Sequence, residues 1–161
     1  MTHELSIHWF RRDLRLHDNA ALYHALKSGL HVLPIFIFDR NILDELIDKD
    51  VELTADKRLI FIHQEITRLK SELNKLGSVL MVFYGKPFDV WKDIIKNYSV
   101  KKVFTNHDYE PYANERDNEI HLFFKAHSIE FNTYKDQVIF EKDEVLKDDG
   151  KPYTVYTPYS K

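Results

Sequence analysis

Short strand-like segments alternate with helix-like segments over most of the chain, and this alternation restricts the fold more than any other feature of the sequence. The clearest strand is HVLPIFIFD, residues 31–39, which is almost entirely apolar. A strand without polar alternation is typical of a parallel sheet that helices cover on both faces. Pro34 lacks a backbone N–H for the ladder, so we expect a bulge or a missing bond at this position.

The remaining segments continue the alternation. Further strands are predicted at residues 5–9, 78–85, 101–107 and 129–140, and helices at 19–29, 55–76, 88–98 and 112–127, with residues 40–54 as a polar loop. This order predicts an α/β fold, a doubly wound, five-stranded parallel sheet with right-handed crossovers. We expect the Rossmann-like strand order 3-2-1-4-5.

Two helix starts and one helix end have local signals. Asp18 is expected to cap the first helix, and Thr54 is expected to cap the long helix that begins at Ala55 or Asp56. Gly77 is expected to end that helix as its C′ residue. The apolar seam of the long helix consists of Leu59, Ile62, Ile66, Leu69, Leu73 and Leu76.

Composition excludes several classes of protein. With 161 residues, 43% of them hydrophobic, the chain is expected to bury one core. Its net charge of −3 leaves no basic excess of the kind that isolated nucleic-acid-binding domains show. The absence of cysteine excludes disulfides and thiolate metal sites, and no stretch approaches the ~18 apolar residues of a membrane span. We expect a cytoplasmic monomer without a membrane segment.

Ligands of open α/β sheets bind outside the carboxyl ends of the strands where the strand order reverses, here between the first and fourth strands. The expected walls are Trp9, Phe10, Arg11 and Arg12 after the first strand, Phe38 and Asp39 after the second, and Asn106, His107, Asp108 and Glu110 after the fourth. Aromatic faces and carboxylates suit a planar ligand with donor groups. The chain has only four glycines and neither a G-x-G-x-x-G nor a P-loop motif, which disfavours dinucleotides and triphosphates.

Other chemistries have little support. The nine histidines show no metal-ligand spacing, and no serine lies in a nucleophile elbow. The stretch HWFRRDLRLHDNAAL, residues 8–22, is unusual because it combines three arginines with two aspartates. These charges either neutralise one another at the surface, for ~0–1 kcal/mol a pair, or hold a second domain or an anionic group through the forks of the guanidinium groups.

Periodicity ends near residue 140. The segment KDEVLKDDGKPYTVYTPYSK has a turn, two prolines and three tyrosines but neither a helical nor an alternating period. We therefore divide the chain into an α/β domain, residues 1–140, and an exit segment, residues 141–161. The exit segment either packs back on the sheet or connects to a further domain.

Several stretches together resemble one family. WFRRDLRLHDNAAL, PIFIFD, ADKRLIFIHQEITRLKSELNKLGSVLMVFYGKP, YEPYANERD and YTVYTPYSK, in this order, are similar to the N-terminal antenna domain of the DNA photolyase/cryptochrome family. The resemblance covers essentially the whole chain. It implies a larger helical domain, outside this chain, that binds FAD and damaged DNA and reverses pyrimidine dimers in light, as a carbon–carbon lyase. The resemblance implies no catalytic residue in this chain, and it places Arg12, Asp13, Arg15, Tyr153 and Tyr156 at the boundary between the domains.

The resemblance also implies an antenna chromophore: methenyltetrahydrofolate, a deazaflavin, FMN or none. The pocket residues it implies are Trp9, Phe10, Arg11, Phe36, Phe38, Asp39, Asn106, Asp108 and Glu110. Folate-binding bacterial relatives resemble Y-E-V-N-E-R, whereas this chain has Tyr112 and Ala113 in place of the Asn-Glu pair. This departure favours FMN or a deazaflavin over the folate, and an empty pocket stays an alternative.

Three other readings stay open at this point. The chain could be the same domain of a cryptochrome photoreceptor, a stand-alone sensor that binds a nucleotide or flavin, or a purely structural interaction domain. Stabilisation by a flavin or folate would favour the antenna reading, and stabilisation by ATP alone would favour the sensor.

Overall fold

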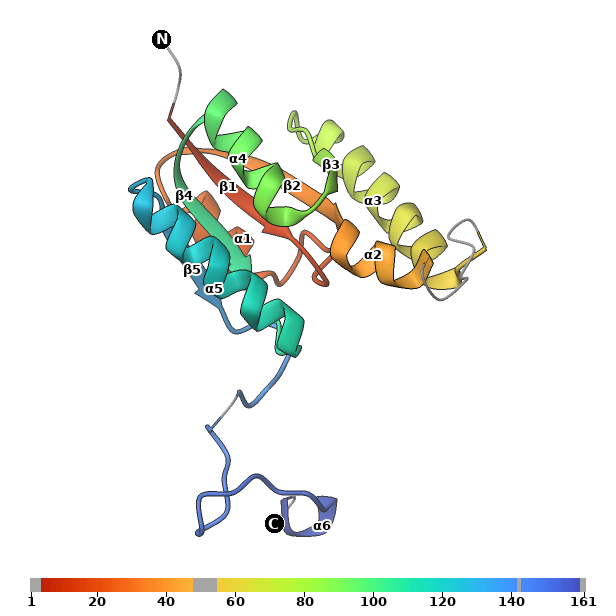
Figure 1. Cartoon of the computed structure of the whole chain (residues 1–161), viewed down its shortest axis with the longest axis vertical. Coiled ribbons are helices and arrows are strands. Elements are labelled where there is room, and N and C mark those ends of the chain that lie inside the picture. The colour runs from red at the N-terminus through yellow and green to blue at the C-terminus, as the bar shows by residue number, and fades with distance from the viewer. Residues whose placement is uncertain (1–3, 48–54, 142, 160–161) are drawn as a thin grey trace.

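The computed structural model describes residues 4–47, 55–141 and 143–159. Its five strands are β1 (Glu4–Phe10), β2 (His31–Asp39), β3 (Met81–Gly85), β4 (Ser99–Asn106) and β5 (Glu130–Tyr134). All neighbouring strands are parallel, in the order β3-β2-β1-β4-β5 (Figure 1). The predicted fold class and strand order are confirmed.

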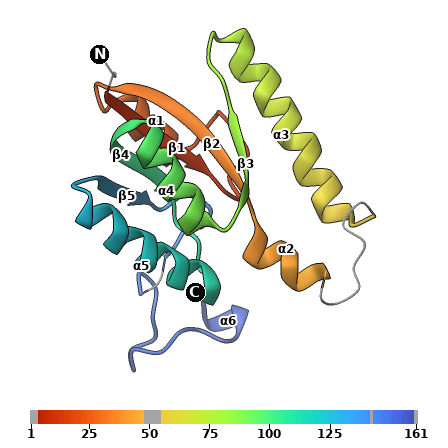
Figure 2. The same ribbon diagram turned by 45° about the horizontal axis from the view of Figure 1, so that its top comes forward.

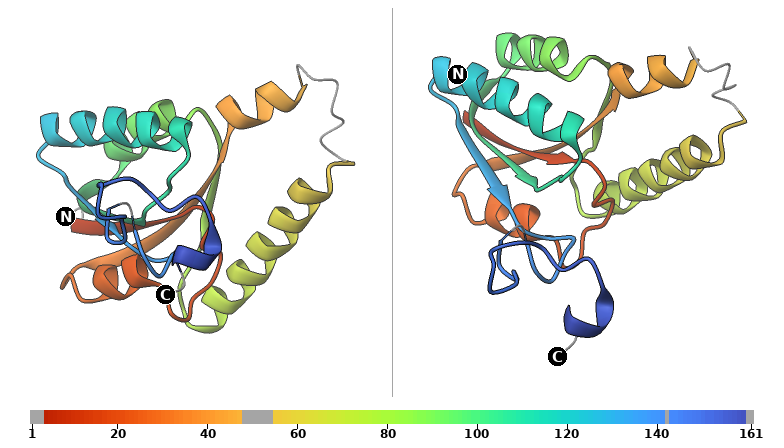
Figure 3. Two further views of the ribbon diagram at one scale, coloured as in Figure 1. Left: turned by 90° about the horizontal axis from the view of Figure 1, so that it is seen from below. Right: turned by 60° about the horizontal axis from the view of Figure 1, so that its bottom comes forward.

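Helices cover both faces of the sheet (Figure 3). One face carries α4 (Pro87–Asn97) and α5 (Pro111–Ala126), and its core contains the edge-to-face pair of Trp9 and Trp91. The other face carries α1 (Ala20–Leu26) and α3 (Lys57–Lys75), with Phe10 and Leu69 fully buried between sheet and helix. The helix α3 extends along the β3 edge of the sheet (Figure 2).

The ladder around Pro34 is regular. Pro34 lies opposite His8 in the pairing of β1 with β2, and no register shift occurs there. The irregularity falls instead in the pairing of β1 with β4, between Leu5 and Ser6. The prediction of a bulge at Pro34 is therefore wrong. The ladder between β2 and β3 begins only at Ile35, so Pro34 removes no donor from it.

The helix caps differ from expectation by one or two residues. Asn19, not Asp18, caps α1, and its side chain accepts a hydrogen bond from the Leu22 N–H at 3.1 Å. Asp18 lies in the left-handed region, with φ of 50°, and turns the chain into the cap. Asp56 caps α3 by accepting from two N–H groups of the first turn, and Thr54 lies outside the described residues.

The end of α3 follows the predicted signal. The helix stops at Lys75, and Gly77 adopts a φ of 76°. The Ser78 N–H donates to the Leu73 carbonyl at 2.9 Å, which closes the last turn. Leu76 therefore lies past the helix and is 73% exposed, so the buried seam of α3 ends at Leu73.

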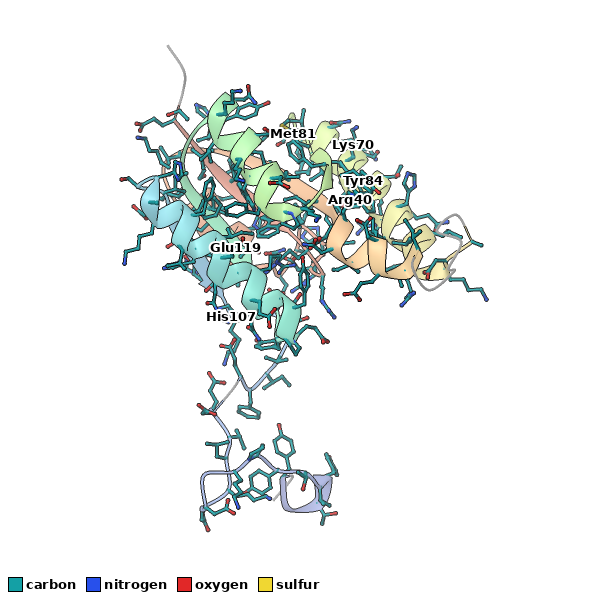
Figure 4. All side chains as sticks on the ribbon, viewed as in Figure 1. Arg40, Lys70, Met81, Tyr84, His107 and Glu119 are labelled. Atoms are coloured by element: carbon teal, nitrogen blue, oxygen red, sulfur yellow. The ribbon has the colours of Figure 1, made fainter. Side chains whose placement is uncertain are left out.

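The predicted loop after β2 contains a helix, α2 (Arg40–Ile47). The Asp39 carboxylate accepts a hydrogen bond from the Asn41 N–H at 2.9 Å and so starts the helix directly at the strand end. Leu43 is buried, which gives this helix a packed side. In Figure 4, Arg40 at the start of α2 lies beside Tyr84 of β3.

The exit segment leads away from the sheet (Figure 1). The fifth strand ends at Tyr134, so the predicted extension to residue 140 is not a strand. Glu141 accepts hydrogen bonds from the His107 ring and from the Tyr109 hydroxyl, the latter at 2.8 Å, and fixes the start of the segment. The segment ends in the short helix α6 (Tyr156–Tyr159). In the described parts of the chain, no helix has the length and apolar character to cross a membrane.

Candidate functional site

A polar network fills the gap between β1 and β4, where the strand order reverses. Asp13 is 6% exposed and accepts hydrogen bonds from the Arg11 N–H at 2.8 Å, Asn19 at 2.9 Å and Asn106 at 2.6 Å. The Asn106 side-chain oxygen accepts from the Ala21 N–H at 2.9 Å. The pocket that remains here has a volume of only about 40 Å³. Side chains of the network therefore fill the place where the ligand crevice was predicted.

A cavity of about 480 Å³ lies next to this network, around the carboxyl ends of β1 and β2. Residues of α2 and of the first turns of α3 and α5 complete its lining. Its apolar and aromatic walls include Trp9, Phe36, Ile37, Phe38, Ile42, Leu43, Leu46, Leu59, Ile62, Tyr112 and Ala113, and its charged groups are Arg11, Arg12, Asp39, Arg58, Asp108, Glu110 and Arg116. A concave, largely apolar space with a few polar groups is typical of a site for a small organic molecule, and its volume is within the usual range of about 300–1,000 Å³.

The structure brings most of the predicted pocket residues to this one cavity. Trp9, Arg11, Phe36, Phe38, Asp39, Asp108 and Glu110 line it. Phe10 does not, because it is fully buried in the core under α1 and α3. Asn106 belongs to the polar network instead. Arg12, which was predicted both for a wall of the ligand crevice and for the domain boundary, lines the cavity as well.

Tyr112, which the pocket prediction omitted, connects two walls of the cavity. Its hydroxyl donates to Asp39 Oδ2 at 2.5 Å and accepts from the Asn41 side chain at 2.9 Å. Asp39 is 8% exposed, and this burial raises the pKa of its carboxyl group, while the Tyr112 hydrogen bond opposes the rise. The contact holds the first turn of α5 against the end of β2.

Two arginine side chains lie close to the ring of Trp9. The guanidinium carbons of Arg11 and Arg116 are 5.2 and 5.0 Å from the centroid of the Trp9 ring. Arg11 Nη1 donates to both oxygens of Asp117 at 2.7 Å, and its Nη2 donates to the Asn106 carbonyl. Burial lowers the pKa of Arg11, and Asp117 opposes that change. Arg116 Nε donates to the same carboxylate at 3.0 Å, so one aspartate serves two guanidinium groups.

The residues predicted for an interface are mostly used within the domain. Asp13 is in the buried network, and Arg15 forms an ion pair with Asp136 at 2.7 Å. Arg12 is bonded to Asp108 at 3.2 Å, yet its side chain is 59% exposed. Tyr153 is half-buried, and Tyr156 is 76% exposed. The charge of the opening stretch is thus largely explained by pairs inside the domain.

The histidines that the structure describes form no metal centre. Across residues 4–47, 55–141 and 143–159, no group of three or more His, Cys, Asp or Glu side chains is arranged to hold an ion. His8 is fully buried, and neither of its ring nitrogens has a hydrogen-bond partner among the described residues. Burial lowers the pKa of His8 to about 4, against the attraction of Asp13 at 4.0 Å.

His107 lies at the end of the sheet below α5 (Figure 4) and contacts Glu141.

Comparison with known proteins identifies the family. The family model described as DNA photolyase matches residues 6–161. The chain belongs to the DNA photolyase family. Its similarity extends to proteins with different names: a deoxyribodipyrimidine photo-lyase of Synechococcus is 29% identical over 95% of this chain, and Cryptochrome-2 of Gallus gallus is 32% identical over 94%.

Solved photolyase structures have the same fold. The class III photolyase of Agrobacterium tumefaciens aligns with 99% of this chain and 31% of its own, at a TM-score of 0.84 and 26% identity. The photolyase of Sulfolobus tokodaii, a structure with two FAD molecules, aligns with 86% of this chain and 32% of its own, at a TM-score of 0.71 and 30% identity. The chain spans 30% of the Synechococcus photolyase and 25% of the chicken cryptochrome, so it corresponds to one domain of these larger photolyase-family proteins.

Proposed function

We propose that this domain binds a planar antenna chromophore in the cavity between α2, α3 and α5, and that FMN or a deazaflavin fits it better than methenyltetrahydrofolate. When bound, such a chromophore absorbs near-ultraviolet or blue light and passes the excitation to FAD. The observation that carries the proposal is the cavity itself, about 480 Å³ at the carboxyl edge of the sheet, with aromatic and other apolar side chains beside several charged ones. The second FAD of the Sulfolobus photolyase, described as a novel light-harvesting cofactor, supports a flavin.

The residues of the cavity would position the ring and exclude water. Phe38 offers an apolar ring, whereas guanidinium groups lie over the rings of Trp9 and Tyr112. These groups and Asp39 offer the polar contacts. The Tyr112–Asp39 and Arg11–Asp117 bonds hold these groups in place. Fixed walls matter because transfer of excitation through space depends on how rigidly the chromophore is oriented.

We further propose that the domain works within a longer photolyase that repairs pyrimidine dimers in DNA, with its exit segment leading to an FAD-binding domain. The exposed guanidinium of Arg12 and the exposed ring of Tyr156 are suited to that domain boundary. The 32% identity to Cryptochrome-2 favours a photoreceptor as the second candidate. Repair of a dimer-containing oligonucleotide by the illuminated full-length protein supports the lyase, and flavin photochemistry without repair supports the photoreceptor.

Antenna binding is tested by titrating the 161-residue chain separately with FMN, a 5-deazaflavin, methenyltetrahydrofolate and ATP, and by recording absorbance and thermal unfolding. We expect a red-shifted flavin band and a raised Tm with FMN or the deazaflavin, since a ligand of the folded state stabilises it by mass action. Stabilisation by ATP alone would favour a nucleotide sensor, and binding of none of the four would contradict the proposal.

Two neighbouring residues of α2 provide a matched pair of variants. Leu46 lines the cavity, whereas Ile47 is not among its lining residues and is 49% exposed. Leu46→Trp is expected to occupy part of the space and weaken flavin binding at least tenfold. Ile47→Trp introduces the same ring outside the cavity and is expected to change the Kd by less than about twofold. Equal affinities of the two variants would place the ligand elsewhere.

A further inference from the structure

Arg116 is a buried cation with incomplete hydrogen bonding. Its side chain is 9% exposed, and its Nε donates to Asp117 Oδ1 at 3.0 Å. Its Nη2 also lies 3.0 Å from that oxygen but makes no hydrogen bond within the described part of the chain. A buried N–H without an acceptor is unfavourable, so this group is suited to a ligand that brings one.

Among the described residues, Asp117 is the acceptor that Arg116 uses, and it is already engaged by Arg11. Both of its oxygens accept from Arg11 Nη1 at 2.7 Å, and Arg116 shares one of them. A guanidinium group has five N–H donors in a fixed plane, and a single shared carboxylate oxygen satisfies few of them. The neighbourhood thus contains more buried donors than acceptors.

This excess of donors is located at the cavity. Arg116 lines it, with its guanidinium carbon 5.0 Å from the Trp9 ring and 5.7 Å from the Tyr112 ring. The acidic group in the same wall, Asp39, already accepts from the Tyr112 hydroxyl and from a backbone N–H of α2. Nη2 itself is covered, so a bound ring meets the exposed part of a guanidinium group with incomplete hydrogen bonding, and a largely satisfied acceptor.

We propose that Arg116 determines the specificity of the cavity, by donating to the carbonyl oxygens of a pyrimidine-dione ring edge such as that of a flavin or 5-deazaflavin. This inference rests on the proposed chromophore site. A dione edge presents two carbonyl acceptors on either side of one N–H. The corresponding edge of a pterin presents an amino group and an N–H beside a single carbonyl, so it brings donors where the protein already has donors. Arg116 discriminates between these ligands through that difference.

The ligands themselves provide the first test, on the unaltered 161-residue chain. Lumiflavin has the dione edge without a phosphate, 6-methylpterin has the donor-rich edge, and phenazine is a tricyclic ring without carbonyls. We expect lumiflavin to bind at least tenfold more tightly than either of the others, as measured by fluorescence or calorimetric titration. Equal binding of lumiflavin and phenazine would overturn the role of Arg116 and leave the chromophore site standing. Binding of none of the three would remove both proposals.

Substitution provides the second test. Arg116→Gln is expected to weaken lumiflavin binding by about 10- to 100-fold, the range of a hydrogen bond from a charged donor, and to leave phenazine binding within about threefold. Arg116→Lys keeps the charge but not the fork, and an intermediate loss is expected. Arg68→Gln alters an arginine of α3 that is held by Glu65 and Glu72, and it should bind lumiflavin as the unaltered chain does. Unchanged lumiflavin affinity in folded Arg116→Gln or Arg116→Lys would refute the proposal.

Discussion

The network that closes the gap between β1 and β4 should be intolerant of one added charge. In Asn106→Asp, the amide that donates to Asp13 at 2.6 Å and to Asn19 at 2.9 Å becomes a carboxylate of the same shape. Both hydrogen bonds are lost, and two carboxylates face each other where Asp13 is 6% exposed. An uncompensated buried charge costs about 3–5 kcal/mol.

Urea unfolding followed by circular dichroism measures this cost. With an m-value of about 2 kcal/mol per molar urea, a loss of about 4 kcal/mol lowers the midpoint by about 2 M at pH 7.5. The paired carboxyls raise the pKa of one member above its unfolded value of about 3.9. Protonation then stabilises the folded variant at low pH, and this stabilisation is lost as the pH rises through the raised pKa. The deficit of the variant should therefore be smaller at pH 5 than at pH 7.5.

Asn118→Asp makes the same chemical change at an exposed position of α5 and should alter stability by no more than about 0.5 kcal/mol. If Asn106→Asp unfolded within about 1 kcal/mol of the unaltered chain at pH 7.5, or if its deficit were the same at both pH values, the network would not be the buried structure described above.

Two further predictions concern buried titratable groups. The pKa of His8 is lowered from 6.5 to about 4 by burial, so between these values the unfolded chain binds a proton that the folded chain does not, and stability should fall by up to about 3 kcal/mol as the pH drops from 6.5 to 4. His8→Phe should remove that part of the decline in urea titrations, and an equal decline in both proteins would assign it to other groups. Tyr112→Phe removes the hydroxyl that donates to Asp39, so it should cost about 1 kcal/mol and raise the pKa of Asp39 further. A carboxyl NMR titration that shows an unchanged or lowered Asp39 pKa would contradict this account.

The sheet was predictable because its strands carry strong local signals. The second strand matches its predicted bounds, 31–39, because its apolar run is long and ends abruptly at Asp39. The end of α3 matches because Gly77 favours the left-handed conformation that the last turn requires. Helix caps were less certain, since Asp18 and Asn19 are neighbouring residues of similar capping preference and only the chain path selects Asn19.

The site was predictable in part. Residues that follow strand ends were placed at the correct edge of the sheet, because parallel strands all end there. The same rule placed Phe10 there wrongly, because a position at a strand end does not show whether the core covers the side chain. No local signal distinguishes Arg116 from the other charged residues of α5. It reaches the cavity only because α5 packs over Trp9 in the folded chain. The helix α2 had a readable signal, because Ile42, Leu43, Leu46 and Ile47 recur at helical spacing, but the segment is short and the polar residues around it are typical of a loop.

The polar network and the cavity depend on each other through Arg11. One end of the Arg11 guanidinium donates to the Asn106 carbonyl, and the other donates to both oxygens of Asp117. The same side chain therefore links the closed gap at β4 to α5 and commits the carboxylate that Arg116 would otherwise use in full. Closing the usual crevice thus has a functional consequence: it moves the available space toward β2, and it leaves a buried donor at the wall of that space.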